Sequence, residues 1–396
     1  MAIRGLTTEV RFSRMAVERI PFNLSSLEGN ELQFLKDSVS SGHNAAKGPY
    51  SVRVSELLQE ALGAKEVLLT TSCTAALELS AMLLDIEPGD NVIVPSFAFV
   101  TTALAFTREG AELRFADIEA DTLGLDPDSV ENLIDDRTRA VVPIHYGGIA
   151  MAIAPLMVLC ERMGVDVVED NAHGLFGSAQ GRPLGSLGRF STLSFHETKN
   201  FSCGEGGALV INCEQDVSRA HTLYDKGTNR ESFRNNHVDR YTWIDKGSSF
   251  GMSDLLAAYL LGQLEQRAVI MKKRKNLFDH YHSALFPLQE RLGFRVPLVP
   301  QGHGLGYHMF YVLASNAKRR TAVLRELNES GIGATFHYQP LHHSTGAQPW
   351  TTQRFDCPTT DSVSSRIIRL PFFTSQNVSQ AERVVEALIG AFERAV

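Results

Sequence analysis

The chain has 396 residues, of which 43% are hydrophobic and 21% are charged, and its formal net charge is −7 at pH 7. These values are typical of a globular protein with a large buried core, and the length favours two or three domains. The acidic balance argues against a protein that binds nucleic acid through bulk charge, although it is compatible with a local basic cleft for a nucleotide's phosphates.

The sequence predicts a cytoplasmic protein with neither a membrane nor a nucleic-acid partner. No apolar run reaches the roughly 18 to 20 residues that span a membrane, and the first ten residues contain no signal-peptide core. The five cysteines are scattered without a Cys-x-x-Cys pair, which is typical of reduced thiols and argues against a zinc site.

The first half of the chain alternates between predicted helices and strands. An arm of about 25 residues precedes helices at 27–39 and 52–62. Short apolar strands follow at 67–69, 92–94, 113–118, 140–145, 166–168, 190–195 and 208–211. The helices between them are predicted at 74–84, 101–108, 126–133 and 154–163. This alternation predicts an α/β domain around a mostly parallel, seven-stranded sheet.

The second half predicts a smaller α+β domain. A strong helix at 253–266 continues into the basic run 272–275, which is typical of a solvated helix face. Strands are predicted at 294–299, 308–314 and 332–338, and helices at 317–330 and 379–395. We therefore expect an arm and large domain at 1–265 and a small domain at 266–396.

The segment around Lys199 concentrates more chemically distinct groups than any other. Ser194 ends an apolar strand five residues before Lys199, and the glycine-rich turn 204–207 follows. A lysine in such a setting has a lowered pKa and can act as a nucleophile that forms a Schiff base. The alternative is an ordinary surface lysine, which its apolar and glycine-rich neighbours argue against.

Asp170 ends the strand some thirty residues before Lys199, and His173 follows three residues later. A carboxylate, a hydroxyl and a lysine in this order are what pyridoxal phosphate (PLP) requires, since it needs an anion against its pyridinium nitrogen and donors for its phosphate. Asp170 is equally suited to cap the next helix or loop. His173 is as consistent with a structural role as with contact to the same ring.

Two further segments suit a cofactor. Residues 71–77 pass from strand to helix through small polar residues, and the helix N-terminus offers N–H groups to an anion, although plain capping by Ser72 or Thr74 gives the same pattern. Phe97 and Phe99 follow another strand, and either ring is placed to stack on a cofactor or to join the core.

With these residues placed, the sequence resembles the DegT/DnrJ/EryC1/StrS family of PLP-dependent sugar aminotransferases. The resemblance runs from Pro21 to Phe372 and implies the fold-type I architecture of aspartate aminotransferase. Its densest matches are 72–78, 194–200 with 204–207, 227–230, 241–243, 247–249, 252–254 and 337–342. Two of them, His-Glu-Thr-Lys-Asn and Lys-Gly-Thr-Asn-Arg, look most like the dTDP-4-amino-4,6-dideoxygalactose transaminase type of enterobacterial antigen synthesis.

The resemblance also implies roles for residues around the cofactor. Lys199 would hold PLP covalently, and Asp170 would pair with its ring nitrogen. The remaining contacts would come from Ser194, Cys73 and Thr74 at the phosphate, and from Phe99 stacked on the ring. Ser249 stands where many members reach the cofactor of a neighbouring subunit, which implies a homodimer with shared active sites.

Two segments depart from the common family pattern. His173 replaces a glutamine expected near the 3-oxygen of the ring, and 247–249 reads Gly-Ser-Ser where many members carry an asparagine. The dTDP-4-amino-4,6-dideoxygalactose branch itself carries Gly-Ser-Ser, so the second departure favours that branch.

The resemblance predicts transfer of the amino group of glutamate to C4 of a dTDP-linked 4-keto-6-deoxyhexose. We expect Lys226, Asn229 and Arg230 to bind the diphosphate, although Arg230 is equally typical of a solvated loop. His308, His337 and Tyr338 are expected near the sugar.

Other functions receive less support from the sequence. A C3-dehydratase of this family carries histidine in place of the lysine, so Lys199 argues against it, whereas an aminotransferase acting at C3 or on another keto sugar stays open. A protein that kept the fold without the chemistry would be expected to lack Lys199, Asp170 or Ser194. No His-Glu-x-x-His and no Gly-Lys-Ser/Thr segment supports a metal or P-loop enzyme.

Overall fold

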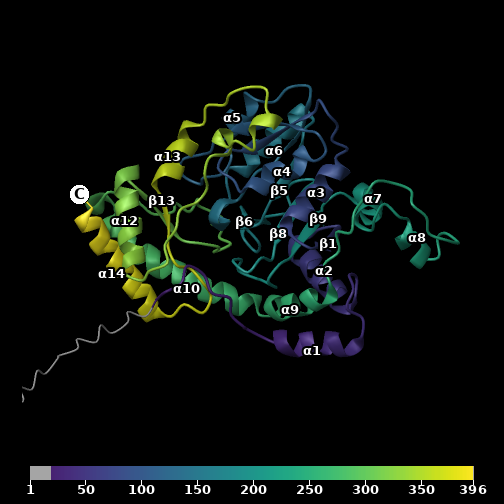
Figure 1. The fold of residues 1–396 in the computed structure, drawn as a ribbon, viewed down its shortest axis with the longest axis horizontal. Helices are drawn as coiled ribbons and strands as arrows, with labels where there is room; N and C mark the ends of the chain where they lie inside the picture. Colours follow the sequence, from purple (N-terminus) through teal and green to yellow (C-terminus); the bar gives the residue numbers. More distant parts are fainter. Residues whose placement is uncertain (1–18, 396) are drawn as a thin grey trace, which may run out of the picture.

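The computed structural model describes residues 19–395, so most of the predicted N-terminal arm lies outside the described residues. Figure 1 shows a large α/β body that carries α1 to α9 and, beside it, a smaller body that carries α10, α12 and α14. None of the helices in residues 19–395 has the length and apolar character needed to cross a bilayer.

A seven-stranded sheet forms the centre of the large domain. In spatial order its strands are β1 (Glu66–Thr70), β9 (Gly207–Ile211), β8 (Phe190–Ser194), β5 (Asp166–Asp170), β4 (Thr138–Val141), β2 (Asn91–Pro95) and β3 (Glu112–Ala116). All run in one direction except β9, which is antiparallel to β1 and β8. The predicted α/β class with a mostly parallel seven-stranded sheet is confirmed.

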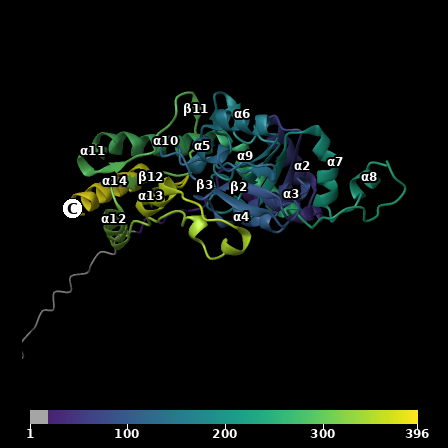
Figure 2. The same ribbon diagram turned by 90° about the horizontal axis from the view of Figure 1, so that it is seen from above.

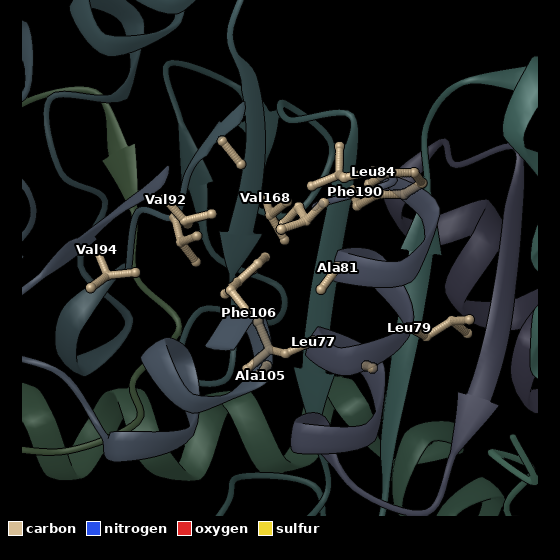
Figure 3. Close-up of a cluster of buried hydrophobic side chains, with 14 of the residues drawn as sticks. Leu77, Leu79, Ala81, Leu84, Val92, Val94, Ala105, Phe106, Val168 and Phe190 are labelled. Carbon is tan, nitrogen blue, oxygen red and sulfur yellow. The ribbon is translucent and has the colours of Figure 1, made fainter. Parts of the chain in front are cut away.

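Helices cover both faces of this sheet because successive side chains of a strand point to opposite faces. Val92 and Val94 of β2 join one cluster with α3 (Cys73–Leu83) and α4 (Val100–Thr107), and Figure 3 shows them with Leu77 and Phe106. Ile93 packs on the opposite face with α6 (Ile153–Met163). The remaining helices of the large domain are α1 (Glu31–Ser41), α2 (Pro49–Leu62), α5 (Pro127–Glu131), α7 (Glu214–Tyr224), α8 (Arg230–Arg234) and α9 (Asp254–Glu265).

The small domain packs helices on a three-stranded antiparallel sheet. The strands are β10 (Phe294–Arg295), β12 (Tyr311–Ala314) and β13 (Ile367–Arg369), and the helices are α10 (Arg267–Leu285), α11 (Gln289–Leu292), α12 (Ala317–Glu329), α13 (Pro358–Arg366) and α14 (Val378–Arg394). In α14, Val384, Leu388 and Phe392 are four residues apart and form one buried face. A separate small sheet joins β6 (Ser178–Ala179), β7 (Arg182–Pro183) and β11 (His303–Gly304).

The strand predicted at 332–338 is wrong. Ile332 and Thr335 form only isolated bridges, to Ile20 and Arg369. The backbone of residues 21 and 22 crosses directly over Gly333, so the segment is held by the start of the described chain. It then turns toward the space between the domains instead of extending a sheet.

The helical prediction around 253–275 needs two corrections. Gln266 (φ −94°, ψ 15°) separates α9 from α10, so the helix at 253–266 does not continue unbroken. The basic run is not a wholly solvated face either, because Arg274 is buried. Its guanidinium donates to the carbonyl oxygens of Tyr307 and His308, at 2.8 Å each, and to the Thr374 hydroxyl at 3.1 Å.

The division of the chain at residue 265 stays a prediction, and the packing adds one qualification to it. Leu341, Ala347 and Cys357 belong to the core cluster of the large domain, although they follow the small domain's strand β12. The Leu341 N–H donates to the Ser96 carbonyl oxygen at 2.9 Å. The chain therefore returns to the large domain before α13 and β13, two elements that the sequence analysis missed.

Candidate active site

A cavity of about 480 Å³ lies where β5 and β8 end, and both domains contribute to its lining. Parallel α/β sheets bind ligands at this carboxyl edge. The lining includes most of the predicted site residues: Cys73, Thr74, Phe99, Asp170, His173, Ser194, Lys199, His308, His337 and Tyr338.

Lys199 lies in a loop that backbone hydrogen bonds close. The Glu197 N–H donates to the Gly204 carbonyl oxygen at 2.9 Å, and Gly204 has a φ of +88°, which favours glycine. Next to the lysine, Asn200 donates through Nδ2 to the Gly306 carbonyl oxygen. These bonds place Lys199 at the cavity wall.

The surroundings of Lys199 favour a neutral amine. Burial lowers its pKa to about 8, and the nearby charge of Arg369 acts in the same direction, whereas Cys73 and Asp170 oppose the shift. An ordinary lysine titrates near pH ~10.4. A larger fraction of Lys199 than of an ordinary lysine is therefore unprotonated, and nucleophilic, close to neutral pH.

Asp170 is a buried carboxylate held in a fixed orientation. Thr102 Oγ1 donates to Asp170 Oδ2 at 2.7 Å, and the Ala172 N–H donates to Oδ1 at 3.2 Å. Burial raises the pKa of Asp170, and the bond from Thr102 opposes that rise. A cationic partner in the cavity would therefore lower this pKa and keep the carboxylate ionised.

His173 is neutral and has a defined tautomer. The Gly147 N–H points at Nδ1 at 3.4 Å, so Nδ1 is the acceptor and Nε2 carries the proton. Burial and the charge of Lys199 keep the pKa of His173 well below its usual range. Its ring stacks on the ring of His308, with the centroids 4.3 Å apart. The N–H at Nε2 is a single hydrogen-bond donor, which is what the amide of the expected glutamine would also provide.

The N-terminus of α3 forms another wall. Ser72 caps the helix, accepting from the Ala75 N–H at 3.1 Å, which leaves the first-turn N–H groups of Cys73 and Thr74 for an outside acceptor. The Ser194 hydroxyl lines the same cavity. Capping and anion binding are both served by this geometry.

Gly207 allows strand β9 to lie close to the first turn of α3. A side chain on Gly207 of β9 would collide with the backbone of Ser72 and Cys73. Any larger residue there would push the first turn of α3 away from β9.

Aromatic side chains from both domains form another part of the cavity wall. His337 lies on Tyr338, with ring centroids 3.5 Å apart, and its Nδ1 is 2.9 Å from the hydroxyl of Tyr146. Phe99 is 55% exposed, and its ring lies 6.3 Å from that of Tyr338. These rings limit the access of water to the amine and carboxylate.

The cavity residues that the sequence analysis missed include Phe22, Thr102 and Arg369. Arg369 precedes the last segment of the resemblance, but β13 has only three residues and shows no periodicity that would mark it. Thr102 lies in an apolar helix, where threonine carries no functional signal.

The remaining predicted residues do not line this cavity. Lys226 pairs with Asp225 at 2.8 Å, and Arg230 lies 3.4 Å from the same carboxylate. Asn229 Oδ1 accepts from the Thr242 N–H at 2.7 Å, while Ser249 forms a backbone bridge with Asp225. All belong to a segment that projects from the large domain with α8 (Figures 1 and 2).

A histidine and aspartate cluster lies outside the cavity lining. His342, His343 and Asp361 bring nitrogen and oxygen atoms within 4.8 Å of one another. The 3.0 Å contact from His343 to Asp361, and the 2.5 Å contact from His342 Nδ1 to the Ser96 hydroxyl, account for the arrangement without an ion.

A comparison with protein families decides the identity of the fold and its chemistry. The profile of the DegT/DnrJ/EryC1/StrS aminotransferase family matches residues 25–389. The chain belongs to this family. It is therefore an aminotransferase that uses PLP, as the sequence analysis predicted.

Solved structures agree with the family assignment. Aminotransferase TlmJ from Streptoalloteichus hindustanus is 27% identical, with a TM-score of 0.88 over 96% of this chain and 100% of that one. The putative sugar aminotransferase Spr1654 from Streptococcus pneumoniae, in its PMP form, is 24% identical (TM-score 0.89; 95% and 100% covered). PseC from Helicobacter pylori, described as an aminotransferase of pseudaminic acid biosynthesis, is 22% identical and shares the fold (TM-score 0.87; 95% and 100% covered).

The residues around the cavity of this family member fit PLP. The half-buried Lys199 amine would hold it covalently, and Asp170 would be the anion for the ring nitrogen. The first turn of α3 and Ser194 would supply phosphate donors, and His173 would supply an N–H near the ring. The set therefore contains one group for each demand of the cofactor.

The lowered pKa of Lys199 predicts how the cofactor-free enzyme takes up PLP. Because only the neutral amine attacks, the rate of covalent capture should rise with pH and level off above about pH 8. Stopped-flow absorbance measures this rate, with Lys199→Ala as the control for other lysines. A rate that keeps rising beyond about pH 9 would contradict the lowered pKa.

The hydrogen bond from Thr102 to Asp170 predicts that removing the Thr102 hydroxyl lowers activity most at acidic pH. Thr102→Val removes a donor to the ionised carboxylate, so the pKa of Asp170 should rise further and the acid limb of the pH–activity profile should move to higher pH. Activity at about pH 6 should then fall more than activity at about pH 8. Thr107→Val is the matched control, since its hydroxyl donates to the Leu104 carbonyl oxygen on the same helix. Equal losses at both pH values would show that Thr102 does not act through Asp170.

Proposed function

We propose that this aminotransferase moves the amino group of glutamate to C4 of a dTDP-linked 4-keto-6-deoxyhexose. The observation that carries the proposal is the convergence of Lys199, Asp170, Ser194 and the α3 N-terminus on one cavity. The description of Spr1654 as a sugar aminotransferase and the role given to PseC support a sugar substrate. The Gly-Ser-Ser segment at 247–249 and the resemblance at 196–200 favour the 4-amino-4,6-dideoxygalactose branch.

In the proposed reaction, each residue around the cavity has a separate role. PLP supplies the electron sink that stabilises negative charge on carbon when it is bound. Lys199 Nζ, whose pKa burial lowers to about 8, would take the proton from Cα of the amino donor and would deliver a proton to C4 of the sugar in the second half of the reaction. Asp170 holds the ring nitrogen in its protonated form through its fixed carboxylate. Phe99 and Tyr338 exclude water and orient the flat ring.

His308, His337 and Tyr338 are proposed to contact the sugar from the small-domain side. Burial lowers the pKa of His337 and keeps that of His308 well below its usual range, so both are neutral at physiological pH. Neutral imidazoles and a phenol can exchange hydrogen bonds with sugar hydroxyls without an ion to desolvate. They suit the neutral, hydroxylated sugar ring of the proposed substrate.

We also propose a homodimer with shared active sites. The projecting segment 226–249 exposes Trp243 (79%), Ile244 (57%) and Tyr241 (50%), and a solvated loop would not favour so much apolar surface. Packing on a second copy would cover these side chains. Lys226, Asn229, Arg230 and Ser249 would then reach the partner's cavity, where they would bind the substrate diphosphate and the cofactor.

The proposed reaction predicts a single product. Enzyme loaded with PLP, glutamate and dTDP-4-keto-6-deoxyglucose should yield 2-oxoglutarate and a 4-amino sugar nucleotide, whose C4 configuration NMR determines. Lys199→Ala should retain cofactor through phosphate and ring contacts but lose turnover by at least about a hundredfold. A product with its amino group at C3, or turnover only with a 3-keto sugar nucleotide, would contradict transfer to C4. Either result would favour an aminotransferase that acts at C3.

Shared sites predict complementation between two inactive variants. Lys199→Ala and Arg230→Ala should each have little activity, but unfolding and refolding them together forms hybrid dimers with one intact site. Random mixing should restore on the order of a quarter of wild-type activity, because half of the dimers are hybrids with one of two sites complete. Activity equal to the mean of the separate variants would rule out sites built from two chains.

A further inference from the structure

Asn200, the residue after Lys199, contacts the cavity wall that the small domain contributes. Its side chain is buried, and its Nδ2 donates to the Gly306 carbonyl oxygen. The opposite orientation of the amide would bring two oxygen atoms together, so Oδ1 is the atom that faces Nδ1 of His308, at 3.1 Å. Because an amide oxygen can only accept, the proton of the His308 ring lies on Nδ1.

The second ring nitrogen of His308, Nε2, is left as an acceptor. Burial keeps the pKa of His308 well below its usual range, so the ring is neutral and Nε2 carries no proton. Within residues 19–395 the ring forms one hydrogen bond, from Nδ1 to Asn200, and His308 lines the cavity. Since buried polar atoms in proteins are nearly always paired, Nε2 requires a donor from a molecule in the cavity.

The two neighbouring imidazoles have the opposite arrangement. Nδ1 of His173 accepts from the Gly147 N–H at 3.4 Å, so the proton of that ring lies on Nε2. Nδ1 of His337 is 2.9 Å from the hydroxyl of Tyr146, whose pKa burial raises and for which residues 19–395 offer no other acceptor. The phenol therefore donates, and Nε2 of His337 is again a donor. Of the three imidazoles, only His308 presents an acceptor.

The turn that carries His308 is held from both domains. Tyr307 has a φ of +47°, which is uncommon for a residue other than glycine. Arg274 donates to the carbonyl oxygens of Tyr307 and His308, at 2.8 Å each, from the side of the small domain. Asn200 donates to the Gly306 carbonyl oxygen from the side of the large domain. The fold therefore fixes the contact between Asn200 and the His308 ring.

An acceptor in this place matches a hydroxyl of a sugar. In a 4-keto-6-deoxyhexose linked through C1, the ring hydroxyls are those at C2 and C3, and they are the groups of the ring that can donate a hydrogen bond. A deoxy position would leave Nε2 of His308 unpaired. Sites built around such a polar atom discriminate strongly against analogues that lack its partner.

We propose that Asn200 is a positioning residue that holds His308 in its Nδ1–H form, so that Nε2 accepts a hydrogen bond from the C2 or C3 hydroxyl of the sugar. The inference rests on the proposed function, because it takes the hydroxylated ring of a sugar nucleotide as the ligand at His308. Asn200 does not line the cavity itself and acts through His308. The pair therefore selects a hydroxylated sugar over a deoxy sugar.

NMR of the PLP-loaded enzyme with isotope-labelled histidine measures the ring form directly. Long-range proton–nitrogen correlations distinguish the two tautomers, and loss of a signal in His308→Gln assigns it. We expect His308 as Nδ1–H in the wild type and as Nε2–H in Asn200→Ala, because the acceptor for the Nδ1 proton is removed. The matched control is Asn212→Ala, which should leave the ring form unchanged. Nδ2 of Asn212 also donates to carbonyl oxygens, those of Gly185 and Gly188, and Asn212 does not line the cavity.

Calorimetry with unreactive sugar nucleotides tests the hydroxyl contact. The probes are dTDP-6-deoxyglucose, which has no keto group, its analogues that also lack the hydroxyl at C2 or at C3, and dTDP alone. In the wild type, loss of one of these two hydroxyls should lower the affinity by about 10- to 100-fold. In Asn200→Ala the difference should shrink to less than about threefold, because Nε2 no longer accepts. Binding of dTDP alone should not change.

A double-mutant cycle separates positioning from a purely structural role. The His308→Gln side chain can offer its own amide oxygen in place of Nε2, and it does not depend on Asn200 for a ring tautomer. Asn200→Ala should therefore raise KM for dTDP-4-keto-6-deoxyglucose by about tenfold in the wild type, but by less than about twofold in the His308→Gln background. A loss of equal size in both backgrounds would show that Asn200 only supports the loop of Lys199, and would overturn the inference.

The remaining outcomes distinguish this inference from the proposed function. An Nε2–H ring at His308 in the wild type overturns the inference whatever the substrate is, and so does an unchanged ring form in Asn200→Ala. Equal wild-type affinity for dTDP-6-deoxyglucose and both deoxy analogues overturns the hydroxyl contact and leaves the proposed function intact. The expected ring forms in an enzyme that neither binds dTDP-6-deoxyglucose nor aminates the keto sugar support positioning by Asn200 and overturn the proposed substrate. The wild-type measurements need no variant other than the one that assigns the signal.

Discussion

The active centre depends on burying an acid and an amine in one cavity without letting them neutralise each other. Burial alone raises the pKa of Asp170 and lowers that of Lys199, so both groups are driven toward their neutral forms. Thr102 and the Ala172 N–H counter this for Asp170, and the field of Asp170 counters it only in part for Lys199, whose pKa still falls to about 8. The result is a carboxylate suited to a cationic ring nitrogen and an amine suited to nucleophilic attack.

Glu169 and Asp170 are adjacent acids on β5, and they have different roles because successive side chains of a strand point to opposite faces of the sheet. Glu169 points to the face away from the cavity, where it accepts from His145 Nε2 at 2.9 Å and from the N–H groups of residues 185, 187 and 188. Although burial opposes ionisation, these donors lower the pKa of Glu169. It therefore fixes the loop that follows β7 as a buried anion with full compensation. Asp170, one residue later, has fewer donors and faces the ligand.

The small domain completes the chemistry that the large domain begins. The large domain contributes the lysine, the carboxylate and the anion-binding helix N-terminus. The small domain adds His308, His337, Tyr338 and Arg369, which all face the same cavity. A ligand that fills the cavity therefore contacts both domains.

The sequence by itself determined those features of the protein that depend on residues close together in the chain. Apolar strands alternating with helices specify the α/β sheet, and the order of Asp170, Ser194 and Lys199 specifies the cofactor, because each group follows directly from the strand that carries it. Only the tertiary structure decided which distant residues join them. Thr102 lies 68 residues from Asp170, and Arg369 reaches the cavity from a three-residue strand whose pairing depends on β12. The same reason accounts for the misassigned segment 332–338, where contact with Ile20 and Phe22 overrides a local preference for strand. Contacts between remote segments leave no periodicity in the chain, so the compensation of a buried charge becomes visible only in the folded molecule.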